Sequence, residues 1–380
     1  MQYLNKKNKD GSMLKIDAVK LAERISIYCL EKTQKTEIYN ILKSFFQNDH
    51  LELFFRSLYF YEAIEISDKI TLNEWGIKNK SNNNLEKINI KLFPPKNYLK
   101  DFLNLHSIKF EDRTDINVIK VKFFKINEYI KKILKKIIFY KYKKKIIIKG
   151  DSKVAIAYNE GIDLNKRSDL FWLKESNVNP KDIILYFEYR GQLNRHGDKK
   201  NLFEKIKKFG IHSINLWEIE NFKKEGFVDN FLNKIKKLNF SDEDSKYLQK
   251  ISLELINKFQ YWYLFFKKYN IKIHMDAKDF KQDIIIKYLA LNKLGGCTLN
   301  KLRSYPEQER TDMGLPLSPC DVFFVPNKDS IKRLKNFTIN KFQYMVNTGY
   351  PYNPLTENNK KEIDEIKNFF HKNNKKFILL

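Results

Sequence analysis

From Gly150 onward, short runs rich in β-branched and aromatic residues alternate with longer stretches whose apolar residues recur at helical spacing. Seven runs have the length and composition of strands: 154–158, 183–187, 212–216, 271–275, 297–299, 322–325 and 343–346. The helical stretches between them cover 202–209, 228–238, 242–269, 280–293 and 329–335. This alternation is typical of a parallel sheet covered by helices on both faces, so we expect a Rossmann-like α/β domain over 150–350.

Capping residues mark the helix starts in this part of the chain. Asp198, Ser241 and Asp279 stand shortly before helical stretches, where a side-chain oxygen accepts hydrogen bonds from the first backbone N–H groups. The stretch 242–269 is longer than a simple crossover between strands requires. We therefore expect it to belong to a pair of helices inserted between two strands.

Residues 1–149 have a different pattern and are expected to form a mixed, mainly helical extension. Apolar residues recur at helical spacing over 17–44, whereas the polar run 79–84 and the pair Pro94-Pro95 interrupt regular structure.

A basic amphipathic helix is predicted over 126–142. Its apolar face comprises Ile126, Ile130, Ile133, Leu134, Ile137 and Ile138, and lysines occupy the opposite face. Such a helix is typical of proteins that lie on an anionic membrane surface. Two other arrangements fit the same pattern: packing against the protein with the lysines in water, and contact with nucleic acid.

The chain is strongly basic. Its 380 residues carry a formal net charge of +26, and residues 120–149 contain twelve lysines and one acidic residue, Glu128. Such an excess favours nucleic acid, anionic lipid or phosphorylated substrates. A codon bias toward Lys, Asn and Ile explains the same composition without a polyanionic partner. Because no known nucleic-acid-binding module is recognisable, we do not expect nucleic acid to be the partner.

The remaining composition points to a reducing compartment. Cys29, Cys297 and Cys320 are scattered and form no CxxC pair or disulfide framework. The N-terminus has no apolar signal-peptide core, and no uncharged apolar run is long enough to cross a membrane. These features predict a cytoplasmic protein, either soluble or peripheral on the inner face of the cytoplasmic membrane.

Ligands of open α/β sheets bind beyond the carboxyl ends of the strands, so the residues that follow each run are candidates for chemistry. After the first run, Glu160 precedes Gly161 in a turn and is expected to act as a general base or, alternatively, to cap the next segment. Arg167 and Asp169 follow in the chain. They either pair with each other or bind substrate, with Arg167 meeting a phosphate.

Further candidates follow other strand-like runs. Glu188 and Arg190 begin a polar loop that suits an anionic or hydroxyl-rich ligand. His274 and Asp276 lie on one face of the fourth run and form a candidate acid/base pair. The alternative is a structural histidine beside a helix-capping aspartate. Arg310, in a long polar loop, is a candidate for holding a phosphate or a carboxylated sugar.

Several enzyme classes have no support in the sequence. The signature motifs of P-loop enzymes, Rossmann dehydrogenases, zinc proteases and serine hydrolases are missing, and no His/Cys/Asp group has metal-ligand spacing. We therefore expect neither a metal nor an organic cofactor.

The end of the chain carries a recognisable succession of features. The segment Asn347-Thr348-Gly349-Tyr350-Pro351 follows the last strand-like run and precedes a polar helical stretch and a fresh apolar run at 376–380. This succession resembles the interdomain hinge of GT-B glycosyltransferases and is similar to that of glycerophosphotransferase-like and surface-carbohydrate enzymes, with Thr348, Gly349 and Pro351 as hinge residues. Two further stretches, 161–172 and 272–276, resemble bacterial surface carbohydrate biosynthesis proteins.

The resemblance extends over residues 150–380 and implies transfer of a sugar from a nucleotide-activated donor to a glycan or lipid-linked glycan acceptor in lipopolysaccharide or capsule synthesis. In GT-B enzymes the first domain mostly holds the acceptor and the second mostly holds the donor. Residues 351–380 would then be the hinge and first strand of a truncated second domain, so a second chain is expected to supply the donor site.

Within this reading, Glu160 or His274 would deprotonate the acceptor hydroxyl. Two functions of other classes stay open: a basic nucleic-acid-binding protein, and an inactive scaffold at the membrane surface.

Overall fold

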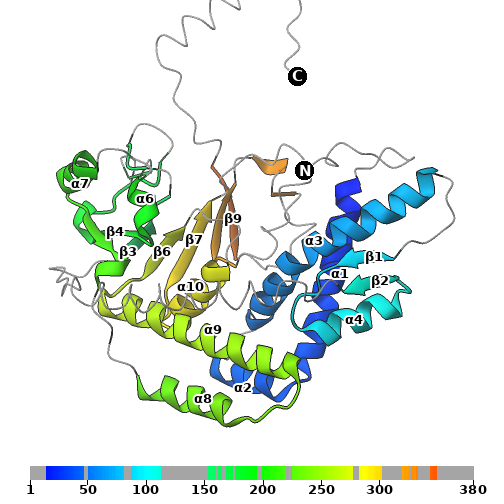
Figure 1. Cartoon of the computed structure of the whole chain (residues 1–380). Coiled ribbons are helices and arrows are strands. Elements are labelled where there is room, and N and C mark those ends of the chain that lie inside the picture. The colour runs from blue at the N-terminus through cyan, green and yellow to red at the C-terminus, as the bar shows by residue number, and fades with distance from the viewer. Residues whose placement is uncertain are drawn as a thin grey trace, which may run out of the picture.

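A seven-stranded parallel sheet forms the centre of the computed structural model (Figure 1). The structure describes residues 14–46, 50–80, 87–112, 153–159, 161–164, 168–170, 172–173, 176–194, 199–219, 222, 225–276, 282–301, 319–325, 327–329, 331–332 and 343–348. The strands are β3 (Val154–Ala157), β4 (Ile183–Phe187), β5 (His212–Asn215), β6 (Ile273–Asp276), β7 (Cys297–Lys301), β8 (Val322–Val325) and β9 (Tyr344–Asn347). All seven strand-like runs of the sequence belong to this sheet, which confirms the prediction of a Rossmann-like α/β fold.

The strand order, β5-β4-β3-β6-β7-β8-β9, sets the position of the site. The chain builds β3, β4 and β5 outward to one edge, returns across the sheet, and adds β6 to β9 on the other side of β3. Val154 of β3 accordingly pairs with Ile183 of β4 on one side and with Ile273 of β6 on the other. Chain growth therefore reverses between β3 and β6, and open α/β sheets bind ligands at such a reversal.

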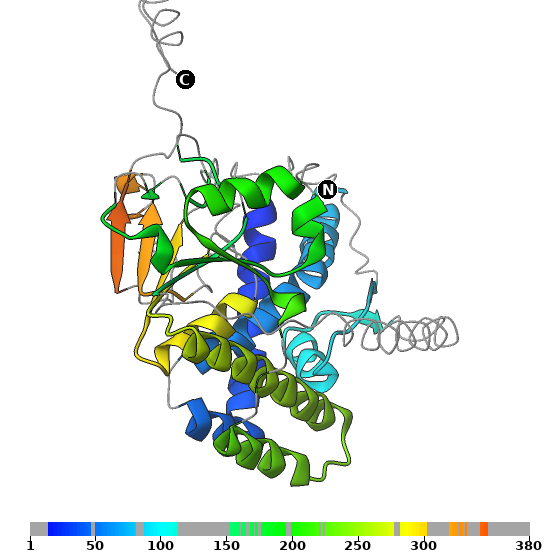
Figure 2. The same cartoon turned by 90° about the vertical axis from the view of Figure 1, so that its left-hand side faces the viewer.

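The central strands are covered on both faces. Every residue of β3 and β4 is buried, as is typical of parallel strands between two layers of helices. One face, with Ala155, Ala157, Ile184 and Tyr186, packs into the same core as α9 and the N-terminal helices. The other face, with Val154, Ile156, Ile183, Leu185 and Phe187, packs with α6 and α7. Figure 2 shows the green α6–α7 segment on one side of the strands and the yellow-green α9 on the other.

The helices α7 (Lys199–Lys208), α8 (Gly226–Lys237), α9 (Glu243–Lys268) and α10 (Gln282–Asn292) agree with the sequence pattern. A further short helix, α6 (Arg190–Asn194), lies where a polar loop was predicted, and 3-10 turns lie at Pro180–Asp182 and Leu216–Glu218. The predicted helical pair is present, because α8 packs on α9 in the connection from β5 to β6. Of the helical stretch expected at 329–335, the residues 329, 331 and 332 are described and helical.

One predicted helix cap is wrong by a single residue. Asp242, rather than Ser241, caps α9, since its Oδ1 accepts a hydrogen bond of 2.7 Å from the backbone N–H of Ser245. A capping side chain must sit at the last non-helical residue, and the helix begins at Glu243. The other two expected caps, Asp198 and Asp279, lie outside the described residues.

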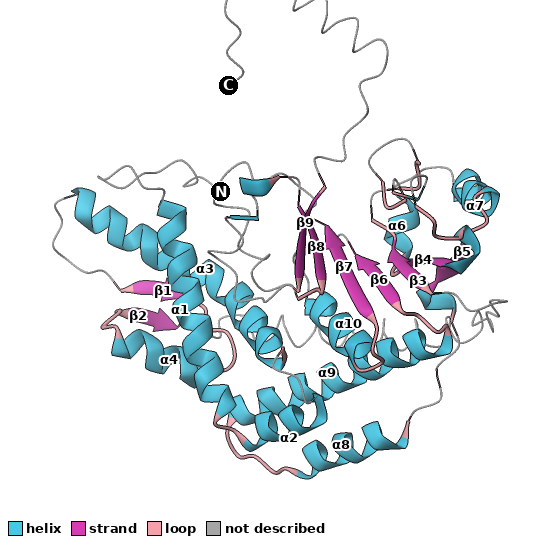
Figure 3. Cartoon of the chain, turned by 180° about the vertical axis from the view of Figure 1, so that it is seen from behind, coloured by secondary structure: helices cyan, strands magenta, loops and turns pink. Residues whose placement is uncertain are grey.

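The N-terminal segment is mainly helical, as expected. It contains α1 (Leu14–Gln34), α2 (Glu37–Phe46), α3 (Leu51–Lys80) and α4 (Lys96–Leu105), with a small parallel pair of strands, β1 (Ile88–Ile90) and β2 (Phe110–Asp112). The helical pattern predicted over 17–44 is divided between α1 and α2. The long helix α3 was not predicted from the sequence. Figure 3 shows α1, α3 and α4 grouped around β1 and β2.

Several contacts join this segment to the main sheet. One core cluster runs from α1–α4 into α8–α10 and one face of the sheet. The carboxylate of Asp244, in the first turn of α9, accepts hydrogen bonds of 2.8 Å from the backbone N–H groups of Lys96 and Asn97 at the start of α4. A carboxylate is stabilising at this end of a helix because the first N–H groups lack partners and the helix dipole is positive there.

Some predictions fall on parts of the chain that the structure does not describe. These are the basic helix at 126–142, the hinge residues Gly349 and Pro351, and the strand at 376–380. Among the helices that are described, none is long and apolar enough to cross a membrane.

Candidate functional site

Three polar side chains meet where the direction of chain growth reverses. Asn159 follows β3, Glu188 follows β4, and Asp276 is the last residue of β6. Because these strands are parallel neighbours in the order β4-β3-β6, their carboxyl ends lie along the same edge of the sheet. The Nδ2 of Asn159 donates a hydrogen bond of 3.1 Å to the Oδ1 of Asp276, which links β3 to β6 directly.

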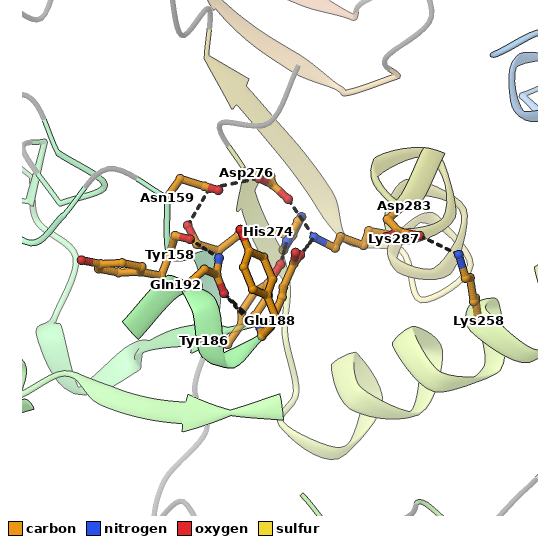
Figure 4. A network of polar contacts seen from close by, with 12 residues as sticks. Tyr158, Asn159, Tyr186, Glu188, Gln192, Lys258, His274, Asp276, Asp283 and Lys287 are labelled. Atoms are coloured by element: carbon orange, nitrogen blue, oxygen red, sulfur yellow. Dashed lines mark hydrogen bonds and ion pairs between the residues drawn. The ribbon is translucent and has the colours of Figure 1, made fainter. Parts of the chain in front are cut away.

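A buried lysine holds two carboxylates together at this edge (Figure 4). The Nζ of Lys287, on α10, lies 2.7 Å from the Oδ2 of Asp276 and 2.5 Å from the Oε1 of Glu188. The side chains of Lys287 and Asp276 are only 1% and 2% exposed, and that of Glu188 is 16% exposed. Glu188 is therefore the member of this ion-paired cluster that solvent reaches.

Aromatic rings complete the surroundings of the ammonium group. Its Nζ lies 4.7 Å from the ring centroid of Trp262 and 5.4 Å from that of Tyr186. Burial by itself lowers the pKa of Lys287, but the charge of Asp276 and further interactions with Tyr186 and Glu188 outweigh it and hold the pKa well above its usual value. Lys287 is therefore an ammonium ion at neutral pH and balances the buried carboxylate.

Lys287 was not among the site residues expected from the sequence, although the sequence contains a signal that a lysine is buried there. Its position lies within the apolar run Ile284-Ile-Ile-Lys-Tyr-Leu-Ala-Leu291, at a place in the helix that is buried. A lysine is almost never fully buried without a partner. A lone charge inside such a run therefore indicates an acidic partner elsewhere in the fold, but helical periodicity does not say which one.

His274 lies on the same face of β6 as Asp276, as alternation predicts, but deeper in the core. It is 2% exposed, and its Nε2 forms a hydrogen bond of 2.7 Å with the hydroxyl of Tyr186. The imidazole stacks near the ring of Tyr186 and lies 5.4 Å from the ring centroid of Phe266. This packing positions Tyr186 under α9, and the catalytic role expected for His274 stays a prediction.

Asp169 fastens the turn that follows β3. Its Oδ2 accepts hydrogen bonds from the backbone N–H groups of Asn159, at 2.7 Å, and Gly161, at 3.2 Å. Gly161 has a φ of 129°, which side-chain-bearing residues rarely adopt. The expected pairing of Asp169 with Arg167, or its binding of substrate, stays a prediction, and the Oδ2 of Asp169 binds backbone groups of this turn. Arg167 lies outside the described residues.

The loop after β4 is fixed by a single amide. The Oε1 of Gln192 accepts hydrogen bonds from the backbone N–H groups of Glu188 and Tyr189, and its Nε2 donates to the carbonyl oxygen of Tyr158. Tyr189 is exposed, and its ring packs against Gly191, where an added Cβ would lie 3.1 Å from the ring carbons. Arg190, the first residue of α6, is also exposed. The loop therefore holds an aromatic ring and a cation at the rim beside Glu188.

The next strand adds two buried polar side chains to the same edge. Asn300 of β7 is the register partner of Asp276 and is 1% exposed, and its Nδ2 has no hydrogen-bond partner among the described residues. Lys301 is also buried, and its Nζ donates a hydrogen bond of 3.1 Å to the carbonyl oxygen of Ser168. Buried amide donors are normally satisfied, so the Nδ2 of Asn300 marks a place where an acceptor belongs.

The described part of the structure does not place the remaining predicted site residues at this edge of the sheet. Glu160, Arg310, Gly349 and Pro351 lie outside the described residues. Thr348 follows β9, the last strand of the sheet, and its backbone N–H donates to the carbonyl oxygen of Val325. Over the described ranges, no group of three or more His, Cys, Asp or Glu side chains is arranged to hold a metal ion.

The chemistry of this edge favours ligands that present hydroxyl groups. Carboxylates accept hydrogen bonds from hydroxyl groups, and side-chain amides both donate and accept. The turn after β3, where dinucleotide-binding sheets hold a pyrophosphate on backbone N–H groups, is occupied here by the carboxylate of Asp169. These N–H groups are therefore not available to a phosphate, and a phosphorylated ligand would have to place its phosphate elsewhere. Comparison of the chain with protein-family models, curated proteins and solved structures finds no match, so the geometry of this edge carries the functional argument.

Proposed function

We propose that the chain is a glycosyltransferase-like protein that transfers a sugar from a nucleotide-activated donor to a glycan or lipid-linked glycan acceptor, in the synthesis of a surface polysaccharide. The observation that carries the proposal is the pair of carboxylates, Asp276 and Glu188, joined by the buried Lys287 at the reversal point of a parallel sheet. Ligands of such sheets bind at this point, and sugars present the hydroxyl groups that carboxylates recognise.

The roles follow from burial. Glu188 is the more accessible carboxylate and contacts the substrate, whereas Asp276 and Lys287 are buried and keep Glu188 and the end of β6 in place. Asn159 extends this support to β3 through its hydrogen bond with Asp276. The general base expected at Glu160 lies outside the described residues, so that role stays a prediction from the sequence.

Binding of glycans by the purified full-length chain tests the proposal without requiring a donor. We expect the chain to bind a subset of oligosaccharides on an array of bacterial lipopolysaccharide and capsule glycans. Glu188→Gln should weaken this binding about 10-fold or more, because a hydrogen bond to a charged group is lost. Glu204→Gln is the matched control, since Glu204 is an exposed glutamate on α7.

Two results would contradict the proposal. One is the absence of binding to any glycan at millimolar concentration. The other is binding that Glu188→Gln and Glu204→Gln weaken equally. Retention of the fold by both variants is checked by far-ultraviolet circular dichroism. Tight binding of a randomised RNA instead of glycans, with a steep dependence on salt, would favour the nucleic-acid alternative.

A further inference from the structure

The loop after β4 carries the Glu188 carboxylate of the proposed function together with two features that the proposed function leaves unused. These are an exposed aromatic ring and a backbone that is fixed by hydrogen bonds. Glu188 and Tyr189 are neighbours in this loop, and the side chain of Gln192 binds the backbone N–H of each. Both side chains are therefore presented from a rigid support at the carboxyl edge of the sheet.

The position of Glu188 in the strand order indicates which kind of ligand its carboxylate binds. In nucleotide-binding sheets of the order 3-2-1-4-5-6, an acidic residue downstream of the first strand–helix turn binds the ribose 2′-hydroxyl. The present sheet extends that order by one strand, and Glu188 directly follows its second strand, β4, beside the reversal point. Lys287 holds the Oε1 of this carboxylate at 2.5 Å, which orients it. A carboxylate offers about four acceptor sites in all, enough to bind Lys287 and a diol together.

Tyr189 provides a surface for a flat ring. Its side chain is exposed, and one edge of its ring lies against Gly191. Stacking of a base on an aromatic side chain tolerates every nucleobase, because each base has a π-face. Ribose hydroxyls on Glu188 and a base on Tyr189 are mutually consistent, since the two side chains belong to adjacent residues.

A second observation points to a ligand at the same edge. The Nδ2 of Asn300 is buried and has no hydrogen-bond partner among the described residues, and Asn300 lies beside Asp276 on the same face of the sheet. A buried donor of this kind is costly unless an acceptor meets it. A bound nucleoside carries hydroxyl and ring oxygens that can serve as acceptors.

We propose that Glu188 and Tyr189 form a ribonucleoside subsite, in which the Glu188 carboxylate binds the ribose hydroxyls and the Tyr189 ring stacks on the base. The inference rests on the proposed function in taking this nucleoside to be part of the sugar donor. The proposed subsite assigns binding of the donor's nucleoside to the sheet described here, whereas the sequence resemblance implied a donor site on a second domain.

Equilibrium binding of nucleotides to the full-length chain tests this subsite. The probes are ADP, GDP, UDP and CDP, each compared with its 2′-deoxy counterpart by isothermal titration calorimetry. We expect at least one ribonucleotide to bind, and its 2′-deoxy form to bind about 10- to 100-fold more weakly, because a hydrogen bond to a charged group is lost. Glu188→Gln should make the two forms bind equally weakly.

The ring is tested separately. Tyr189→Ala should weaken the ribo and deoxy forms by the same factor, about 5- to 100-fold, while Tyr189→Phe preserves stacking and binds as the native chain does. The matched controls are Glu204→Gln and Tyr344→Ala, since Tyr344 is 59% exposed on β9 at the edge of the sheet. Because Tyr189 is a surface residue, its variants remain informative even if Glu188→Gln fails to fold.

The outcomes separate this inference from the proposed function. No ribonucleotide binding at millimolar concentration, equal binding of ribo and deoxy forms, or binding that Tyr189→Ala leaves unchanged would overturn the subsite. If glycans bind on the array while nucleotides do not, the subsite is wrong and the proposed function stands. If nucleotides discriminate as expected while no glycan binds, the subsite stands and the proposed function is wrong.

Discussion

Replacement of Lys287 by methionine is the sharpest test of the ion-paired cluster at the carboxyl edge. Methionine is apolar and unbranched and fills much of the space of the lysine stem, so little packing against Trp262 and Tyr186 is lost. What the substitution removes is the buried cation that pairs with both carboxylates.

The expected magnitude follows from burial. Removing one partner of a buried ion pair costs about 3–5 kcal/mol, because the remaining charge is left without compensation. The side chain of Asp276 is 2% exposed, so its unpaired charge accounts for nearly all of this loss of stability. The side chain of Glu188 is 16% exposed, so water solvates part of its charge. We therefore expect Lys287→Met to lower the free energy of unfolding by about 3–5 kcal/mol at pH 7.

Urea denaturation followed by circular dichroism measures this difference through the transition midpoint. The matched control is Lys258→Met on α9, whose ion pair with Asp283 is 3.1 Å long but has side chains 55% and 46% exposed. That change should cost no more than about 1 kcal/mol. The double variant Lys287→Met/Asp276→Asn should recover about 2 kcal/mol, since it removes the uncompensated charge.

The pH dependence provides a second readout of the same cluster. The pKa of Lys287 in the folded chain lies above its value in the unfolded chain, so its contribution is fully present below pH ~10.4 and is lost as the pH rises through the folded pKa. The difference between the native chain and Lys287→Met should be constant from neutral pH to about pH 9 and shrink at higher pH. A loss below about 1 kcal/mol at pH 7, or no recovery in the double variant, would refute the reasoning.

Three further predictions concern other parts of the fold. Asp242→Ala should cost about 0.5–1 kcal/mol at neutral pH by removing the cap of α9. The hydrogen bond from Ser245 lowers the pKa of Asp242, so this difference should fade as the pH falls below about 4, in urea titrations at several pH values. Gly161→Ala should cost about 1–3 kcal/mol because φ is 129° there, whereas Gly226→Ala, in open space at the start of α8, should change stability by less than about 1 kcal/mol; equal effects would contradict the backbone argument. Burial, assisted by Asp244, raises the pKa of Cys29 to about 12, so iodoacetamide at pH 8 should label Cys29 in urea but not in the native chain, as read by peptide mass spectrometry. Rapid labelling of Cys29 in the native chain would contradict this prediction, because it would require α1 to open.

The pattern of residues determined the sheet well. All seven strand-like runs are strands. The signal is clearest for β3 and β4, because parallel strands buried on both faces appear in a sequence as short, continuous apolar runs between helical stretches. The length of the stretch at 242–269 likewise indicated the helical pair of α8 and α9. The sequence did not reveal α3, a 30-residue helix, since its apolar residues are spread around the helix rather than confined to one face.

The site was recognised only in part. The rule that ligands bind beyond the carboxyl ends of strands indicates Asp169, Glu188 and Asp276 from the sequence alone. Their partners were not predictable: Asp169 binds backbone N–H groups of its own turn, and Asp276 binds a lysine on another element. Such pairings join residues that the chain separates, and local periodicity contains no information about them.

The sequence by itself determined the seven strands of the main sheet and the helices α7 to α10, because burial on one or two faces dictates the period of apolar residues along the chain. Only the tertiary structure decided the strand order, the reversal between β3 and β6, and the meeting of Lys287 with Asp276 and Glu188. The physical reason is that strand order and ion pairing depend on which elements pack together, and that choice is made by long-range burial rather than by neighbouring residues. The carboxylates are visible in the sequence, but the charge that holds them in place is visible only in the fold.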